Sequence, residues 1–243
     1  MTTIAHKLQE VRTRIDVACA SAGRDSSEVG LLAVSKTFPA QCVAEAARAG
    51  QLAFGENYLQ EAVDKMVQLR AAGFPDLVWH CIGPVQSNKT RLVAEHFDWL
   101  HTLDREKIAR RLDEQRLDTL APLNVCIQIN VDGGENKAGV APEEALALAQ
   151  VVAQLPRLCL RGVMSIPEPA PDFETQRALH LRARAVFDAV RAAQLPGCEH
   201  FDTLSLGMTG DLEAAVAAGS TLVRVGSGLF GQRPPHPQST PSA

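Results

Sequence analysis

Residues 29–57, VGLLAVSKTFPAQCVAEAARAGQLAFGEN, contain an apolar run, a helical pattern and a second apolar run in direct succession. The runs at 29–36 and 52–57 have the length and apolar composition of buried strands. The segment 41–50 between them has the pattern of a helix. Two strands joined by a helix through short connections form a right-handed crossover, which makes them parallel in one sheet. This unit therefore predicts an α/β fold.

The same alternation continues to residue 227. Further strands are predicted at 77–83, 98–103, 123–130, 158–166, 200–207 and 221–227, with helical patterns at 58–73, 105–120, 142–155 and 173–194. Eight strands in this length is the count and size of a (β/α)8 TIM barrel. An open doubly wound sheet is the alternative. We favour the barrel because the eight units follow one another without a long interruption, in one domain over residues 1–232.

The two ends of the chain have different patterns. Ile4, Leu8, Val11 and Ile15 recur at helical spacing, so an extra amphipathic helix is predicted before the barrel. Charges are spread through this segment, which excludes a signal peptide or a membrane helix there. The tail 233–243, RPPHPQSTPSA, cannot build a core, and we expect it to be disordered.

Composition narrows the possible partners. The chain has 243 residues, a formal net charge of −4 and only 24 Lys and Arg, which argues against nucleic acid as the main partner. Six scattered cysteines without a C-x-x-C motif indicate a reducing compartment, so we expect a cytoplasmic protein without a membrane partner. The acidic residues of 131–136 offer too few ligands for a metal site. We expect a monomer.

Lys36 ends the first predicted strand. Active sites of TIM barrels form at the C-terminal ends of the strands, so Lys36 is expected at the barrel mouth. It shares one strand face with Leu32 and Val34. If that face points inward, burial lowers the pKa of the amine and exposes a nucleophile suited to forming a Schiff base. The alternative is a lysine that extends along apolar surface to reach water.

A glycine-rich turn, GSGLFG at 226–231, follows the last strand. It matches the dinucleotide-binding fingerprint G-x-G-x-x-G, but only twelve residues follow it and none is acidic, so that interpretation fails. TIM barrels commonly bind phosphate after strands 7 and 8. Strand 7 also leads into such a turn, in LSLGMTGDLEAAVAAG (204–219), where Thr209 or Asp211 can cap a helix. Two adjacent turns favour a phosphate site over two plain connections.

Arg224 lies two residues before Gly226 and shares its strand face. An inward arginine needs a partner because its charge is always present. The partner is either a carboxylate across the barrel, in a structural ion pair, or a ring nitrogen or anion of a ligand.

Taken together, six stretches closely resemble the pyridoxal phosphate homeostasis protein family: LLAVSKTFP, FGENYLQEA, WHCIGPVQSNKTRLVAEHFDWLHTLDR, NVCIQIN with ENKAG, RGVMSIP, and LSLGMTGDLEAAVAAGSTLVRVGSGLFG. They run from residue 31 to 231. Members look like the barrel half of alanine racemase without its second domain. The resemblance implies pyridoxal 5′-phosphate (PLP) as the cofactor, held and supplied within the cell, with apo PLP-dependent enzymes as possible recipients.

The resemblance also assigns residues. It makes Lys36 the Schiff-base lysine, places Asn57 near the PLP ring and places Arg224 at the pyridine nitrogen. It assigns the phosphate to Met208, Thr209, Gly226 and Ser227. Thr209 stands where the family more often has serine, Gly210 where an acidic residue is common, and Gly228 where alanine is usual. None of these departures removes a hydrogen-bond donor.

Three other features are given structural interpretations. We interpret His80 as a buried histidine bonded to a neighbour rather than a catalytic base. Ser87 or Asn88 is predicted to cap a helix, although the resemblance places the loop 87–89 at the site. Lys137 is interpreted as a solvated amine at the rim of the site.

Three classes of function fit these features: a PLP carrier or regulator, an amino-acid racemase that uses PLP, and a Schiff-base aldolase acting on a sugar phosphate. The aldolase needs carboxylates near the amine, and strands 1 and 2 offer only Glu56. The racemase needs acid–base groups on both faces of the cofactor, and the chain's one tyrosine is Tyr58. A cation at the ring nitrogen weakens the ring as an electron sink. The carrier is therefore favoured, with weak racemase-like activity as the main alternative.

Overall fold

Eight parallel strands pair in chain order and close into a barrel. The computed structural model describes residues 3–133 and 138–231. The strands are β1 (Gly30–Val34), β2 (Ala53–Glu56), β3 (Val78–Cys81), β4 (Trp99–Leu103), β5 (Leu123–Gln128), β6 (Leu158–Met164), β7 (Thr203–Ser205) and β8 (Leu222–Val225). The predicted (β/α)8 barrel is confirmed. The predicted tail 233–243 and Lys137 lie outside the described residues.

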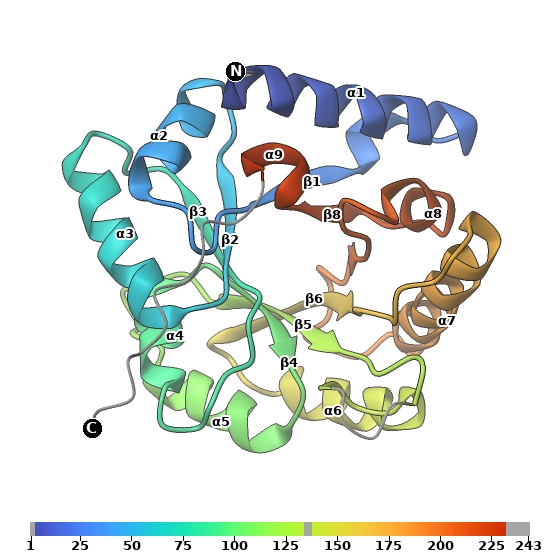
Figure 1. The fold of residues 1–243 in the computed structure, drawn as a ribbon. Coiled ribbons are helices and arrows are strands. Elements are labelled where there is room, and N and C mark those ends of the chain that lie inside the picture. Colours follow the sequence, from blue (N-terminus) through green and yellow to red (C-terminus); the bar gives the residue numbers. More distant parts are fainter. Residues whose placement is uncertain (1–2, 134–137, 232–243) are drawn as a thin grey trace, which may run out of the picture.

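Helices surround the strands on the outside of the barrel (Figure 1). They are α1 (Ile4–Ser21), α2 (Ala40–Arg48), α3 (Leu59–Ala71), α4 (Thr90–His96), α5 (Glu106–Gln115), α6 (Ala145–Val152), α7 (Phe173–Ala192), α8 (Leu212–Ala217) and α9 (Ser227–Phe230), with short 3-10 turns at Ser26–Glu28 and Pro142–Glu144. Asp211 is the N-cap residue of α8. The predicted caps Ser87 and Asn88 are wrong, because α4 starts at Thr90 with Lys89 as its N-cap residue.

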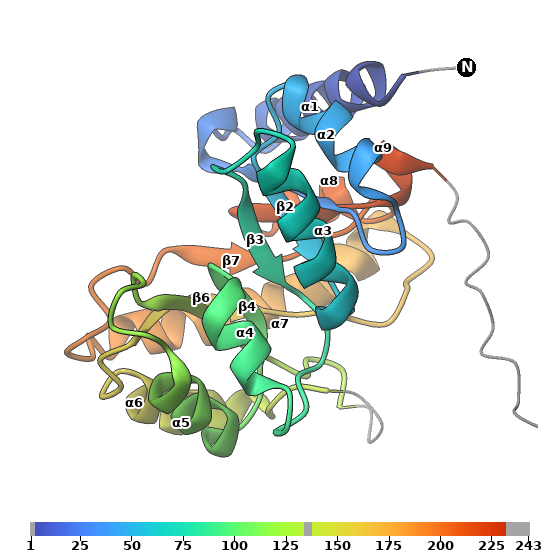
Figure 2. The same cartoon turned by 90° about the vertical axis from the view of Figure 1, so that its left-hand side faces the viewer.

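The helix α1 packs against α8 and α9, which flank β8 near the end of the described residues. Leu8, Val11 and Ile15 are buried, and α1 contacts α8 and α9. Arg14 adds polar contacts, since its guanidinium donates two hydrogen bonds of 2.9 Å to the Glu213 carboxylate and one of 3.1 Å to the carbonyl of Thr209. Figures 1 and 2 show α1 lying across this side of the barrel. The predicted amphipathic helix is confirmed.

The barrel closes between its first and last strands. Strand β1 pairs with β8 in the register Leu32–Arg224 and Ala33–Val225. The residues that follow these strands, Lys36 and the turn after Gly226, therefore lie at the same end of the barrel. No helix in the described part of the chain is both long and apolar enough to cross a membrane.

Candidate functional site

A cavity of about 290 Å³ opens at the C-terminal ends of the strands. The seven residues predicted for the site all line it: Lys36, Asn57, Met208, Thr209, Arg224, Gly226 and Ser227. Apolar side chains of Val34, Ile82 and Ile166 complete the wall, together with Gly210. The fold thus brings residues from six segments of the chain to one place. Their individual roles remain predictions.

Hydroxyl groups meet on the β7–β8 side of the cavity. The hydroxyl of Ser227 donates to Thr209 Oγ1 at 3.3 Å, and the amide of Gly228 approaches the same oxygen at 3.4 Å. A Cβ atom at Gly228 would lie 3.0 Å from Thr209 Cγ2, so the two turns are in close contact. Such a group of hydroxyls and first-turn amides is suited to an anion.

The backbone amide of Met208, expected to donate to a phosphate, has another hydrogen-bond partner in the structure. It donates to Asp211 Oδ1 at 2.6 Å, inside its own loop, so this predicted phosphate donor is already in use in the structure. The other carboxylate oxygen of Asp211 lies 2.9 Å from His180 Nε2. Burial raises the pKa of Asp211, but the hydrogen bonds from His180 and Met208 outweigh it and lower that pKa overall. Asp211 therefore fixes the loop that carries Thr209.

Gly207 allows the same loop to approach α8. Its φ is +86°, a conformation that favours glycine, and an added Cβ atom would lie 2.4 Å from the Cβ atom of Ala215. A larger residue would separate the end of β7 from the helix that follows it.

Arg224 lies inside the barrel, below the cavity. Its guanidinium donates to the carbonyl and hydroxyl oxygens of Ser205, at 2.6 and 2.9 Å, and to the carbonyl of Ser165 at 2.9 Å. Burial lowers the pKa of Arg224 to about 10, so the side chain stays charged at neutral pH. Among the described residues its hydrogen-bond partners are serine oxygens, not a carboxylate. The proposed ion pair across the barrel is not what the structure shows.

Two histidines continue this chain of hydrogen bonds. His101 Nδ1 lies 3.0 Å from the hydroxyl of Ser205, and His101 Nε2 lies 2.9 Å from His80 Nδ1. Burial lowers the pKa of His80 to about 3 and that of His101 well below its usual range. The interpretation of His80 as a buried, hydrogen-bonded histidine is confirmed. His101 was missed, because it lies within the apolar run 98–103 and no neighbouring residue distinguishes it.

Asn57 follows β2 and lines the same cavity. Its side-chain oxygen Oδ1 is buried and has no hydrogen-bond partner among the described residues. A Cβ atom at Gly83 would lie 2.5 Å from the backbone oxygen of Asn57, so glycine is needed where the ends of β2 and β3 meet. An unpartnered buried amide oxygen is costly, and a polar ligand in the cavity would reduce that cost.

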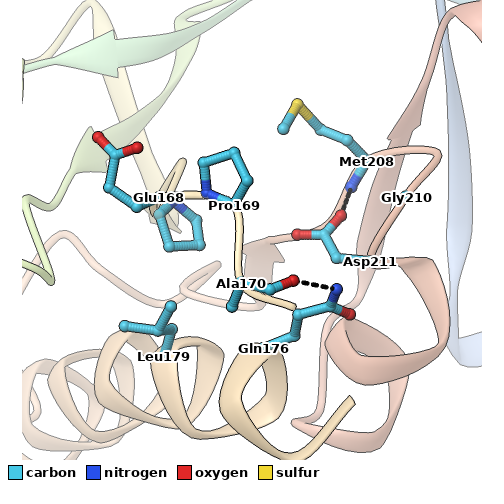
Figure 3. A pocket seen from close by; sticks show the side chains of 9 residues that line it. Glu168, Pro169, Ala170, Gln176, Leu179, Met208, Gly210 and Asp211 are labelled. Atoms are coloured by element: carbon cyan, nitrogen blue, oxygen red, sulfur yellow. Dashed lines mark hydrogen bonds between the residues drawn. The ribbon is translucent and has the colours of Figure 1, made fainter. Parts of the chain in front are cut away.

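A second cavity, of about 350 Å³, adjoins the first and shares Met208 and Gly210 with it. Figure 3 shows the side chains of Pro169, Leu179 and Gln176 around it, with Asp211 directed toward the Met208 amide. The loop of Met208 therefore separates two adjacent hollows at the barrel mouth.

Comparison with known proteins agrees with this geometry. A family model described as alanine racemase, N-terminal domain, matches residues 6–234. The pyridoxal phosphate homeostasis protein of Escherichia coli strain K12 is 53% identical over 233 residues, covering 96% of this chain and 98% of that protein. The protein of the same name from Pseudomonas aeruginosa is also 53% identical, covering 96% and 97%. The chain belongs to the pyridoxal phosphate homeostasis protein family.

Solved structures extend the comparison. The structure of PipY from Synechococcus elongatus with PLP bound matches with a TM-score of 0.81 and 36% sequence identity. The match covers 94% of the present chain and all of PipY. Alanine racemase from Corynebacterium glutamicum has a TM-score of 0.65 at 20% identity, with 95% of this chain matched to 60% of the racemase. The second likeness concerns the fold alone.

We predict that acidification destabilises the fold through His80 and His101. In the unfolded chain both take up a proton near pH 6.5, whereas in the folded barrel they stay neutral at lower pH. Stability is therefore lost as pH falls below about 6.5, by about 2 kcal/mol for each histidine between pH 7 and pH 5. Urea denaturation at the two pH values measures this loss.

His101→Gln provides the control. This substitution should remove about half of the pH dependence of the unfolding free energy. It keeps a hydrogen-bonding side chain between Ser205 and His80. An unfolding free energy that is the same at pH 5 and pH 7 in the native sequence would contradict the prediction.

Proposed function

We propose that this protein binds PLP as a Schiff base on Lys36 and supplies or buffers the cofactor in the cell. The observation that carries the proposal is that Lys36 and the Thr209–Ser227 hydroxyl pair line one cavity. An amine and a pair of hydroxyls in one small cavity suit a molecule that carries both an aldehyde and a phosphate. When bound, PLP supplies a reactive aldehyde and an electron-accepting ring.

The remaining residues of the cavity fit the same ligand. Asn57 offers a side-chain amide to the polar substituents of the ring, and its Oδ1 has no partner among the described residues. Arg224 supplies a permanent cation below the cavity. PipY, whose structure contains PLP, is similar along the full length of its chain. The donor set and this likeness support the cofactor assignment together.

The same residues argue for a carrier rather than an enzyme. Arg224 is charged, and a cation at the ring nitrogen disfavours its protonation, which weakens the ring as an electron sink. Glu56, the carboxylate that an aldolase would need, is engaged by Lys65 at 2.6 Å and by the Ser35 hydroxyl at 2.6 Å. We propose that racemase-like activity is at most weak and that aldolase activity is absent.

We further propose a monomer in a reducing, cytoplasmic compartment, with apo PLP-dependent enzymes as recipients of the cofactor. All six cysteines are free thiols, which suits such a compartment. A cavity open at the barrel mouth suits a protein that releases its ligand to another.

The first test is labelling. Purified protein mixed with PLP should turn yellow, and borohydride should bleach the band and fix a pyridoxyl group on Lys36, identified by peptide mass spectrometry. Lys36→Ala should weaken binding of PLP but not of pyridoxine 5′-phosphate, which has no aldehyde. Lys107→Ala, an exposed lysine on α5, should behave as the native protein. Protein that stays colourless with added PLP would refute the proposal.

The second test concerns the phosphate. Thr209→Ala or Ser227→Ala removes one hydrogen bond to a charged group, a loss of roughly 1.5–3 kcal/mol. The affinity for PLP should fall about tenfold to a hundredfold. Binding of pyridoxal, which lacks the phosphate, should change much less. Equal losses for both ligands, measured by titration, would mean that these hydroxyls act through folding instead.

The third test concerns turnover. The PLP-loaded protein should show slow or absent racemisation of L-alanine, because the charged Arg224 weakens the electron sink. Solvent-deuterium exchange followed by chiral separation measures this. Turnover in the ordinary enzyme range of ~1–1000 per second would favour the racemase. Arg224→Glu should raise α-proton exchange, at a cost in stability if the new carboxylate is left unpaired.

A further inference from the structure

A group of charged side chains contacts the residues on both sides of Lys36. Lys65, from α3, and Glu56, from the end of β2, are 4% and 0% exposed, and their charged atoms lie 2.6 Å apart. Glu61, one helical turn before Lys65 and one-third exposed, lies 3.2 Å from the same ammonium. We call Glu56, Glu61 and Lys65 the charged triad. None of the three lines the cofactor cavity.

The ammonium of Lys65 uses its full hydrogen-bonding capacity. It donates to Glu56 Oε1 at 2.6 Å, to Glu61 Oε1 at 3.2 Å and to the backbone carbonyl of Ser35 at 3.0 Å. A lysine ammonium has three protons, so these three acceptors satisfy it. One of them belongs to the residue directly before Lys36.

The two carboxylates of the triad also bind the chain around Lys36. Glu56 Oε1 accepts the hydroxyl proton of Ser35 at 2.6 Å. Glu61 Oε1 accepts from the amide of Thr37 at 2.9 Å. Ser35 is thus held through both its carbonyl and its hydroxyl, and Thr37 through its amide. The residues on both sides of Lys36 are fixed while Lys36 itself lines the cavity.

The turn that follows β1, residues 35–39, needs these hydrogen bonds to keep its conformation. Thr37 has φ of +68°, the left-handed region, which a β-branched residue avoids because its side chain crowds the backbone. Packing encloses the turn only in part, because Phe38 is buried against Phe230 but Thr37 and Pro39 border an outer hollow of about 410 Å³ that Glu61 and Lys65 also line. The hydrogen bond from Thr37 to Glu61 therefore helps to hold a strained conformation.

A contribution to the stability of the fold does not by itself explain why three charged side chains are grouped here. Burying charged groups costs several kcal/mol per ion, and well-packed apolar side chains of the same volume are often as stable or more so. Burial accordingly raises the pKa of Glu56 even though Lys65 lies beside it. What an apolar replacement cannot do is bind three polar atoms of the turn and fix their positions.

We propose that the charged triad positions Lys36 for its reaction with the aldehyde of PLP. The inference rests on the proposed function and adds three positioning residues to it. In that reaction the Lys36 nitrogen, as the free amine, attacks the aldehyde carbon. The new C–N bond becomes C=N as the aldehyde oxygen leaves as water, taking up the two protons that the amine nitrogen loses. Attack requires the nitrogen to approach the carbon along a fixed direction, which the turn sets.

The test separates positioning from binding. Lys65→Met and Glu61→Ala are compared with the native protein for two quantities: the rate at which PLP forms its borohydride-reducible adduct on Lys36, and the affinity for pyridoxine 5′-phosphate. Both variants should slow adduct formation by roughly tenfold to a hundredfold, the effect expected of a small misplacement of a reacting group. Affinity for pyridoxine 5′-phosphate should stay within about threefold, since none of the triad residues lines the cavity in which Thr209 and Ser227 lie.

Matched variants complete the design. Glu61→Gln keeps an oxygen that can accept from the Thr37 amide, so it should recover much of the rate lost in Glu61→Ala. Lys107→Met, at an exposed position on α5, should match the native protein in both quantities. Lys65→Met leaves Glu56 buried without its partner and can fail to fold. Glu61 is partly exposed, so the Glu61 variants decide the matter in that event.

Four outcomes are informative. Native rates in Glu61→Ala would overturn the inference, and so would parallel losses of adduct formation and of pyridoxine 5′-phosphate binding, which would show that the triad acts on the fold. A native protein that forms no adduct on Lys36 would instead refute the proposed function. A slow reaction with intact binding, rescued by Glu61→Gln, would establish the positioning role.

Discussion

The pairing of β1 with β8 is the constraint on which the candidate site depends. It joins the first strand of the barrel to the last, in the register Leu32–Arg224. Because both strands run in the same direction, the turn of Lys36 and the turn of Ser227 leave the barrel side by side. The amine and the hydroxyl pair lie far apart in the chain, and this one ladder of backbone hydrogen bonds brings them to the same cavity. A shift of register would separate them.

In the part of the chain that the structure describes, the positive charge beside the cavity is not paired with a carboxylate, whereas the carboxylates nearby are paired within the protein. Arg224 stands below it with only serine oxygens as hydrogen-bond partners among the described residues, so its positive charge is not neutralised by direct pairing. The carboxylates nearby are engaged elsewhere, Asp211 by His180 and the Met208 amide, and Glu56 by Lys65. The cavity therefore favours an anionic ligand, because the negative charges around it are compensated within the protein.

Most of the fold and the members of the site could be predicted from the sequence. Strands and helices alternate with clear periods, and a barrel collects strand ends, so Lys36, Asn57 and Ser227 could be assigned to one cavity. Contacts between side chains could not be predicted in the same way. The link from Glu56 to Lys65 joins a strand to a helix, and His101 meets Ser205 across the barrel interior. Such pairs depend on rotamers and register, which hydrophobic periodicity does not encode.

The packing of α1 against α8 and α9 has a consequence for synthesis of the chain. The apolar face formed by Leu8, Val11 and Ile15 is synthesised before all eight strands, whereas the helices that cover it, α8 and α9, follow β7 and β8. Contacts between distant parts of a chain form slowly, and exposed apolar surface invites aggregation in the meantime. The nascent chain therefore carries an uncovered α1 until α8 and α9 have been synthesised, and its barrel can close only once β8 is available to pair with β1.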